Sequence, residues 1–512
     1  MMMKWKRVVG LFFGWMLCVS APARAQSPPS PDFERAALFS SYAAFHDSLT
    51  AVVNVADAAV RDSLLDVFWD DLLTGNQVPY AEGDSVAFLY RGAASSVAWR
   101  GDFNGWGESP GVRLGDTDVW MFETTLPADA RTDYKVFRNG SEWLLDSANP
   151  LVMWSGFGPN SELRMPAYVY PMETVRRNEV GRGALSEDVA FHSDRLGYDV
   201  NYRVYTPPGY FALDDLPVVY VTDGHEYAAD HLGSMVVVLD NLIADARIPP
   251  VMAVFIDPRN PANLAENRRG TEYVANPAFA DFVADELVPA VDAAYRTRAT
   301  ADGRAILGTS LGGLNAAYFG ATKTDVFHNV AIQSPAFWAW PEIYDLYRDT
   351  PFLDLRIFMS NGTLHDGDGG PTMAAILEEK GYTFKFIETH EGHSWGQWRG
   401  LIDEALLYFF GEAGVVAVER ETPSAEAPTL AAFPNPARGA VRLTFRLPHA
   451  SPVRLAVYDV LGRLRATLLD GERRGPGAHT VRLDVAGWPG GVYVIRLVTA
   501  RGSVATPVVL TR

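Results

Sequence analysis

Cysteine is almost absent from this sequence. The 512 residues include one cysteine, Cys18, which lies in an apolar stretch near the amino terminus. A chain with one cysteine forms no internal disulfide and offers no cysteine cluster for a metal ion. The folded protein must therefore be stabilised by packing, and a nucleophile has to be sought among other residue types.

Basic residues are also scarce, with 44 Lys and Arg against 62 Asp and Glu. The formal net charge of -18 argues against a nucleic-acid partner, because a nucleic-acid surface needs a basic face. A chain of 512 residues is too long for one compact core. We therefore expect roughly two to four domains.

The first 25 residues have the pattern of a secretory signal peptide. Three basic residues between positions 4 and 7 precede an apolar run over 8–19 and the small-x-small sequence Ala23-Arg24-Ala25. The apolar run is too short to cross a membrane, which disfavours the alternative of a membrane anchor. We expect residues 1–25 to be removed, export through the periplasm to the cell surface or the medium, and no stable membrane insertion.

Two different patterns precede the middle of the chain. Residues 26–78 are expected to be helical, because Leu38, Tyr42, Phe45 and Leu49 recur at helical spacing and a second helix fits 57–73. Residues 79–168 form short apolar segments between turn residues, which predicts a small antiparallel β-sandwich. Its strands are expected at 85–90, 96–100, 119–124 and 133–138.

From residue 184 to 412, strand-like runs alternate with amphipathic helical segments. The expected strands are 199–206, 218–222, 252–256, 305–307, 329–333, 356–360 and 383–387. This alternation predicts a mostly parallel, doubly wound sheet of the α/β class.

A Gly-x-Ser-x-Gly sequence at 308–312 follows one of these apolar runs. It predicts a strand, a sharp turn and a helix, in which the glycines allow strained backbone and a close approach of strand and helix. Ser310 is therefore a candidate nucleophile, although an ordinary glycine-rich turn remains the alternative. The N–H of Leu311, at the start of the helix, is a candidate donor to an oxyanion.

A general base is sought among the histidines that follow Ser310 in this region. His393 follows the final expected strand in a glycine-containing loop before the last helix, and we choose it over the competitor His390. A serine hydroxyl needs an imidazole to accept its proton, and the imidazole later protonates the leaving alcohol. A surface histidine without a role is the alternative for either residue.

An acid to orient the histidine is expected one strand earlier, in the loop at 361–370. Asp366 or Asp368 could fix the tautomer and stabilise the imidazolium, and Asp366 is preferred. The sequence Asp-Gly-Asp-Gly-Gly at 366–370 lacks the twelve-residue spacing and terminal glutamate of a calcium loop. A plain polar turn is the alternative for Asp368.

Part of the expected sandwich resembles the early-set immunoglobulin-like modules related to glycogen-binding domains. The matching residues are 101–106 (Gly-Asp-Phe-Asn-Gly-Trp), 119–120, 134–137 and 146–150. The same module precedes the catalytic domain in enterochelin-esterase-like proteins. Exposed tryptophans stack on sugars in carbohydrate-binding relatives, but Trp99, Trp106 and Trp120 are expected to be packing residues here.

Four motifs make residues 184–412 similar to the esterase D and enterochelin-esterase-like family of α/β hydrolases, which includes feruloyl and other carbohydrate esterases. These motifs are Val221–His225, Glu266–Tyr273, Gly308–Gly313 and Gly392–Trp395. The resemblance implies that His225 or its neighbour gives the second oxyanion N–H. It also implies that Gly224, Arg269 and Glu272 lie at the acyl pocket, although Arg269 and Glu272 could equally be a structural ion pair.

Aromatic residues near the expected strand ends suit an aromatic acyl group or a sugar, or else belong to the core. Trp338 and Trp395 are the candidate pocket residues of this kind. A ferric siderophore lactone would favour a basic pocket, with which Arg268, Arg269 and Arg399 are compatible.

The chain ends in a linker at 413–430 and a second expected β-sandwich at 431–512, with strands at 441–447, 453–459, 479–484 and 492–499. The sequence Phe-Pro-Asn-Pro-Ala-Arg-Gly at 433–439, together with residues 457–463 and 490–493, resembles the C-terminal sorting domain of type nine secretion. The resemblance implies engagement of the secretion machinery. The alternative is a sugar-binding or purely structural sandwich.

Together these patterns predict a secreted serine esterase in which Ser310, His393 and Asp366 form and hydrolyse an acyl-enzyme. The expected substrates are sugar-linked, aromatic-acyl or siderophore esters, and no metal or organic cofactor is required. Two alternatives remain open: a non-catalytic glycan-binding surface protein on a hydrolase scaffold, and an acyltransferase to a sugar.

Overall fold

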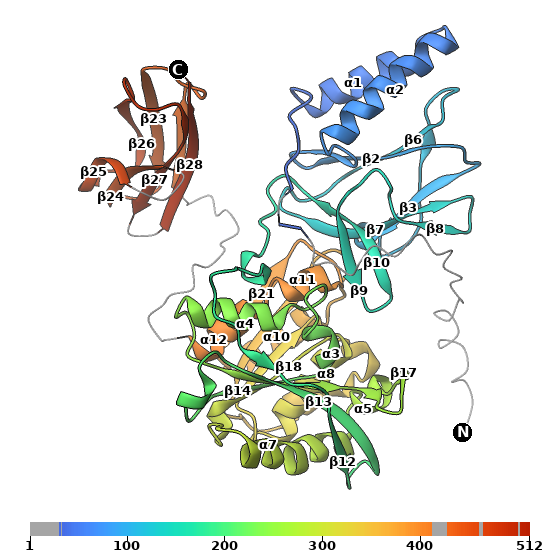
Figure 1. The fold of residues 1–512 in the computed structure, drawn as a ribbon, viewed down its shortest axis with the longest axis vertical. Helices are drawn as coiled ribbons and strands as arrows, with labels where there is room; N and C mark the ends of the chain where they lie inside the picture. The colour runs from blue at the N-terminus through green and yellow to red at the C-terminus, as the bar shows by residue number, and fades with distance from the viewer. Residues whose placement is uncertain (1–29, 32, 412–427, 460–463, 500–501, 512) are drawn as a thin grey trace. The chain divides into compact units, whose positions relative to one another are not determined.

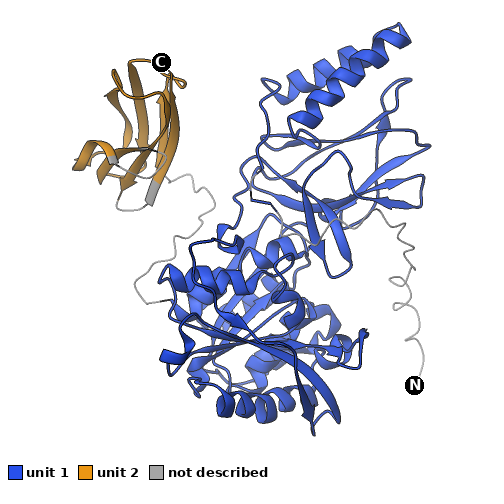
Figure 2. Cartoon of the chain, in the orientation of Figure 1, with its two compact units in different colours: residues 1–415 blue, residues 416–512 orange. Residues whose placement is uncertain are grey.

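The computed structural model describes residues 30–31, 33–411, 428–459, 464–499 and 502–511. It divides into two compact units, residues 1–415 and 416–512 (Figure 2). The expected signal peptide, Cys18 and most of the expected linker at 413–430 lie outside the described residues.

The first unit begins with two helices, α1 (Tyr42–Val53) and α2 (Ala58–Thr74) (Figure 1). Each begins at a side-chain cap: Ser41 Oγ accepts from the Ala44 N–H at 3.0 Å, and Asp57 Oδ1 accepts from the Val60 N–H at 3.1 Å. Phe45 of α1 stacks on Tyr80 with 4.0 Å between ring centroids, which fixes the helices on the following sheet.

Residues 80–164 form two antiparallel sheets that share one core. The first sheet has the order β1-β2-β6-β5, and the second β4-β3-β7-β10-β9 with β8 beside β7. Phe88 and Trp120 of the first sheet and Trp99 and Tyr134 of the second pack in the shared core, so the region is a sandwich. The bounds are β1 (Tyr80–Glu82), β2 (Ser85–Arg91), β3 (Val97–Gly101), β4 (Ser109–Pro110), β5 (Val112–Arg113), β6 (Val119–Thr125), β7 (Arg131–Arg138), β8 (Glu142–Leu144), β9 (Val152–Ser155) and β10 (Gly158–Arg164).

The tryptophans of this sandwich lie largely inside it. Trp99 and Trp120 are buried, as predicted, and Trp106 is half-buried with its indole N–H donating to Asp102 Oδ1 at 2.9 Å. The sheet-rich architecture agrees with the sequence, while the assignment to the early-set immunoglobulin-like modules stays a prediction.

Residues 184–411, the α/β region, contain a nine-stranded sheet with the order β11-β13-β15-β14-β18-β19-β20-β21 and with β12 beside β13. Strands β15, β14 and β18 to β21 are parallel, and β11, β12 and β13 form an antiparallel edge. The bounds are β11 (Ala184–Leu185), β12 (Val189–Ser193), β13 (Tyr198–Thr206), β14 (Val218–Val221), β15 (Met252–Asp257), β18 (Arg304–Thr309), β19 (Asn329–Gln333), β20 (Arg356–Gly362) and β21 (Phe384–Thr389). The predicted α/β sheet is confirmed.

Both faces of this sheet are covered by helices. On β14, Val218 and Tyr220 point into one core cluster and Val219 and Val221 into the other, as the two-residue period of a strand requires. The first cluster is closed by α6 (Pro277–Asp281), a π-helical turn (Phe282–Leu287), α7 (Val288–Ala294), α8 (Leu311–Thr322), α9 (Glu342–Asp349) and α10 (Gly369–Glu379). The second is closed by α4 (Met235–Ala244), α11 (Trp395–Arg399) and α12 (Ile402–Phe410).

The hairpin of β9 and β10 leaves the sandwich and packs on the α/β region. β9 contacts α11, and Met153 of β9 is 1% exposed within the second core cluster of the α/β sheet. The sandwich and the α/β region therefore share part of one core.

The second unit is a separate sandwich of two sheets, β22-β23-β26 and β25-β24-β27-β28. β23 alternates between buried and exposed residues, and its Val441, Leu443 and Phe445 meet Leu455 and Ile495 of the other sheet in one core. The bounds are β22 (Thr429–Phe433), β23 (Ala440–Leu447), β24 (Ser451–Asp459), β25 (Leu464–Arg474), β26 (Gly477–Asp484), β27 (Gly491–Thr499) and β28 (Gly502–Leu510).

Candidate active site

Ser310 stands on a strained turn between β18 and α8. Its backbone has φ 58° and ψ -118°, a conformation that costs energy for a residue with a side chain. The turn closes because Gly308 and Gly312 lack a side chain: a Cβ on Gly308 would lie 2.3 Å from the Gly312 carbonyl oxygen, and one on Gly312 would lie 2.6 Å from Thr222 Oγ1. The sequence therefore builds a turn that lifts the Ser310 hydroxyl out of the sheet.

The imidazole of His393 lies between this hydroxyl and a carboxylate. His393 Nε2 is 2.9 Å from Ser310 Oγ, and Nδ1 is 2.6 Å from Asp366 Oδ1. The Asp366 side chain is fully buried, while that of His393 is 39% exposed. This arrangement can pass a proton from the hydroxyl to the imidazole while the carboxylate holds Nδ1 protonated.

Asp366 is itself held by two donors on its other oxygen. Oδ2 accepts from the Ser334 hydroxyl at 2.6 Å and from the Gly362 N–H at 2.5 Å. Ser334 lies just after β19 with φ 40°, and its Oγ also accepts from the Trp398 indole N–H at 2.9 Å. Ser334 was not among the predicted site residues; its signal in the sequence is a polar residue directly after the buried strand β19, which pairs with the strand that precedes Ser310.

The other histidine and carboxylates near this loop have other places in the structure. His390 pairs with Asp129 at 2.7 Å, away from Ser310. Asp368 occupies the N-cap position of α10. Glu391 is buried against Arg131, 3.5 Å from its guanidinium. The carboxylate that meets the His393 ring is thus the one preferred from the sequence.

The short helix α3 (Gly224–Tyr227), which follows β14, begins with the expected pocket residue Gly224 and the expected oxyanion residue His225. A Cβ on Gly224 would lie 2.3 Å from the Phe255 backbone, so a side chain is excluded there. His225 Nδ1 is 3.4 Å from Asp257 Oδ1, and burial lowers the pKa of His225, which favours a neutral ring. The other expected donor, the Leu311 N–H, is the first of α8 and has no acceptor within that helix.

The expected pocket residues Arg269 and Glu272 do not pair with each other. Arg269 binds Asp223 with both ends of its guanidinium, at 3.1 and 3.0 Å, and so anchors the turn that carries Gly224. Glu272 accepts from the Tyr198 hydroxyl at 2.9 Å, and burial raises its pKa to about 7. The alternative of an ion pair between Arg269 and Glu272 is therefore wrong, because each has another partner.

The two expected pocket tryptophans differ in exposure. Trp338 is 81% exposed in the short turn after β19. Trp395 is 2% exposed, and its indole N–H donates to Glu226 Oε2 at 3.1 Å. Burial raises the pKa of Glu226 to about 7. Trp395 thus packs in the core and offers no open ring face, a correction to its expected place in the pocket.

The described part of the chain has neither a metal-binding cluster nor a membrane-spanning helix. Within it, no group of three or more His, Cys, Asp or Glu side chains is placed to hold a metal ion. No helix of the described residues is both long and apolar enough to cross a bilayer.

Two segments of the chain match known protein families. Residues 193–409 match the family described as "Putative esterase", and residues 431–511 match the "Secretion system C-terminal sorting domain". These matches confirm the two interpretations drawn from the sequence, an esterase-like hydrolase and a C-terminal sorting domain.

Relatives with named activities are similar over part of their length. The chain is 28% identical over 255 residues to the iron(III) enterobactin esterase of Escherichia coli O6:H1, covering 45% of this chain and 60% of that protein. It is 24% identical over 243 residues to the endo-1,4-beta-xylanase/feruloyl esterase of Xylanibacter ruminicola, covering 46% and 32%. The chain thus spans less than two thirds of either relative.

A solved structure, the ferric enterobactin esterase from Salmonella typhimurium, has a similar fold. Its TM-score is 0.56 at 21% identity, covering 65% of this chain and 95% of that one. The covered share is larger than residues 193–409, so the likeness of fold extends beyond that segment.

Proposed function

We propose that this carboxylic ester hydrolase works through an acyl-enzyme on Ser310. Its residues 193–409 match the esterase family, and its residues 431–511 match the secretion-system sorting domain. One observation carries the proposal: the His393 ring lies 2.9 Å from Ser310 Oγ on one side and 2.6 Å from Asp366 on the other. The sorting domain directs the protein to secretion and the cell surface.

In the first half of the reaction, Ser310 Oγ attacks the ester carbonyl carbon and its proton passes to His393 Nε2. Asp366 keeps the Nδ1 proton in place and stabilises the imidazolium. The Leu311 N–H and an N–H near His225 stabilise the oxyanion. His393 then protonates the leaving alcohol as its bond to the acyl carbon breaks.

In the second half, water gives a proton to His393 and attacks the acyl carbon. The bond to Ser310 Oγ breaks, the serine recovers its proton, and the acid leaves. A sugar hydroxyl in place of water would make the same site an acyltransferase. Since water is abundant and the His393 side chain is 39% exposed, hydrolysis is the reaction we propose.

For the substrate we propose an ester with an aromatic acyl group or a sugar alcohol. Ala336 donates to the Ser310 carbonyl at 2.9 Å, and the exposed Trp338 lies two residues further along, so an apolar ring face is available beside the nucleophile. Of the basic residues compatible with an anionic siderophore, Arg269 pairs with Asp223, Arg268 lies 3.5 Å from Glu266, and Arg399 is only 2% exposed, so they offer little free positive charge at the surface.

The test is hydrolysis of p-nitrophenyl acetate by the full chain and by Ser310→Ala, followed by feruloyl esters, acetylated sugars and enterobactin. We expect the wild type to hydrolyse the small ester and Ser310→Ala to lose at least about a thousandfold in kcat/KM. Equal rates for the two proteins would refute the mechanism. A folded wild type without activity on any ester would favour a glycan-binding protein instead.

A further inference from the structure

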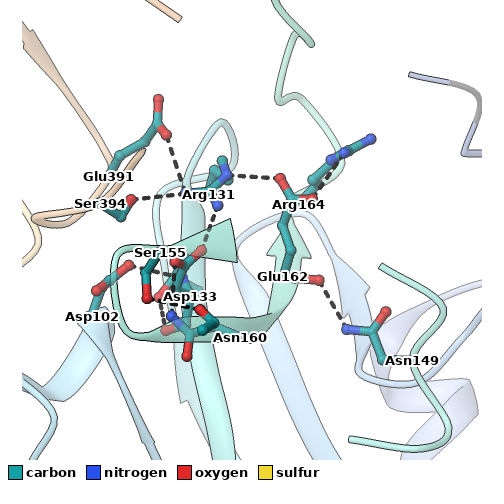
Figure 3. Close-up of polar contacts among 12 residues, drawn as sticks. Asp102, Arg131, Asp133, Asn149, Ser155, Asn160, Glu162, Arg164, Glu391 and Ser394 are labelled. Atoms are coloured by element: carbon teal, nitrogen blue, oxygen red, sulfur yellow. Dashed lines mark hydrogen bonds and ion pairs between the residues drawn. The ribbon is translucent and has the colours of Figure 1, made fainter. Parts of the chain in front are cut away.

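The loop that carries His393 is held from the N-terminal sandwich. Figure 3 shows Arg131, the first residue of β7, beside Glu391 and Ser394. The backbone N–H of Arg131 donates to the His390 carbonyl at 3.0 Å, and the Arg131 guanidinium donates to Ser394 Oγ at 3.1 Å. These contacts lie on both sides of the candidate base.

Arg131 is rigidly placed within the sandwich. Its side chain is 1% exposed, its Nε donates to Glu162 at 2.7 Å, and its remaining nitrogen binds Asp133. Glu162 in turn binds Arg164 at 2.9 Å. A guanidinium with fixed partners on two sides has few orientations available, so the donor that it offers to Ser394 is fixed in space.

The backbone around His393 lies directly against these side chains. An ideal Cβ on Gly392 would lie 2.3 Å from both Cβ and Cγ of Asp102, and one on Gly396 would lie 1.9 Å from the Arg131 guanidinium carbon. Both positions therefore exclude any side chain, and the approach explains why glycines flank the histidine.

The same turn of the sandwich also meets the loop that carries Asp366. Asp102, in the Gly-Asp-Phe-Asn-Gly-Trp turn, accepts from the Asp133 N–H at 2.8 Å. At the far end of that turn, an ideal Cβ on Gly105 would lie 3.4 Å from the His365 ring. Leu364 packs on the sandwich core. Both catalytic loops thus rest on a turn whose sequence is similar to that of glycan-binding modules.

We propose that the N-terminal sandwich is a working part of the active site and that Arg131 is a positioning residue for His393, acting through Ser394 and the His390 carbonyl. The inference rests on the proposed function, in which His393 is the base. If Arg131 only joined the two domains, substitutions at this contact would lower the stability of the protein without a separate effect on kcat. A positioning role predicts a loss of kcat when the link to the loop is cut and the rest of the network is kept.

The experiment removes, in the full chain, the hydrogen bond from Arg131 to Ser394 and leaves the other two contacts of Arg131 with this loop, to the His390 carbonyl and to Glu391. Ser394→Ala removes the hydroxyl that Arg131 reaches but leaves Asp133 and Glu162 paired, and Ser394→Thr restores a hydroxyl. We expect Ser394→Ala to lower kcat roughly tenfold with KM within about twofold, and Ser394→Thr to recover most of kcat. The matched control is Arg138→Ala, which breaks an exposed sandwich ion pair with Glu142 and should leave kcat unchanged.

A double-mutant cycle tests whether both residues act through one contact. Arg131→Lys keeps the positive charge but loses the fork that reaches Ser394 and Glu162 together. We expect Ser394→Ala to have little further effect on kcat in the Arg131→Lys protein. Full kcat in Ser394→Ala, or additive losses that only follow the melting temperature, would overturn the inference.

Hydrogen exchange separates this inference from the proposed function. We expect amides of 390–396 to exchange faster in Ser394→Ala and Arg131→Lys than in the wild type, while those of α8 stay unchanged. Unchanged exchange at 390–396 would refute the positioning role whether or not the protein is active. A wild type as inactive as Ser310→Ala, with faster exchange in the variants, would refute the esterase mechanism alone.

Discussion

Removal of the Ser334 hydroxyl is expected to weaken catalysis without touching any of the three proposed catalytic side chains. The hydroxyl has two possible acceptors, Asp366 Oδ2 at 2.6 Å and Gln397 Oε1 at 2.9 Å, and the charged, nearer carboxylate is the stronger one; the hydroxyl oxygen accepts from Trp398 Nε1 at 2.9 Å. In Ser334→Ala the carboxylate keeps one donor on Oδ2, the Gly362 N–H. Asp366 is then held less firmly in the orientation that meets His393.

The size of the effect follows from the kind of hydrogen bond that is lost. A hydrogen bond to a charged group contributes about 1.5–3 kcal/mol. Each 1.36 kcal/mol corresponds to about a tenfold change in rate, so kcat/KM should fall by about 10- to 100-fold if the whole contribution is felt in the transition state. The unpaired indole N–H of Trp398 should also lower the free energy of unfolding by about 1–3 kcal/mol.

The assay is kcat/KM for p-nitrophenyl acetate together with urea unfolding, for wild type, Ser334→Ala and Ser360→Ala. Ser360 is the matched control, since its hydroxyl is buried at the end of the next strand without a hydrogen-bond partner among the described residues. Ser360→Ala should leave both quantities near wild type. A Ser334→Ala protein with wild-type kcat/KM would refute the reasoning that Ser334 orients Asp366.

Two further predictions concern pH and the pocket. Burial raises the pKa of Glu391 to about 7, above its value of 4.5 in the unfolded chain, despite the opposing charge of Arg131. The contribution of Glu391 to the free energy of unfolding is therefore full below pH 4.5 and is lost as the pH rises through 7. Glu391→Gln should lessen the fall in the free energy of unfolding, measured in urea, between pH 5 and pH 8. The same pH dependence in both proteins would contradict this. Trp338→Ala should raise KM for a feruloyl ester by about 3- to 10-fold but not for p-nitrophenyl acetate, and equal changes for both esters would exclude ring stacking.

The sequence predicted the parts of this protein that depend on short-range patterns. The strand-turn-helix at Ser310 and the parallel strands follow from glycine spacing and apolar runs, and the family matches confirm an esterase and a sorting domain. The chosen Ser310, His393 and Asp366 lie within hydrogen-bonding distance of one another, while their roles stay predictions.

Such short-range patterns do not predict contacts between residues that are far apart in the sequence. Arg131 and Ser394 are 263 positions apart, and nothing local distinguishes a buried arginine of this kind from a surface one. Trp395 was expected in the pocket because aromatic residues near strand ends suit both a core and a binding site, and the structure buries it. The strands β9 and β10 were missed since their residues, from Val152 to Arg164, mix polar and apolar types without clear alternation.

The side chain of Met153 has a consequence for how this enzyme could be recombined. It belongs by sequence to the sandwich but lies in the second core cluster of the α/β sheet, together with Tyr227 of α3 (Gly224–Tyr227) and Trp395 of α11. A chimera that joins the α/β sheet to the N-terminal sandwich of another esterase would lack Met153 and would leave its place in that cluster empty. The sandwich and the α/β sheet should therefore be transferred together when domains are recombined. The chain is better divided after residue 411, before the second compact unit, than between the sandwich and the sheet.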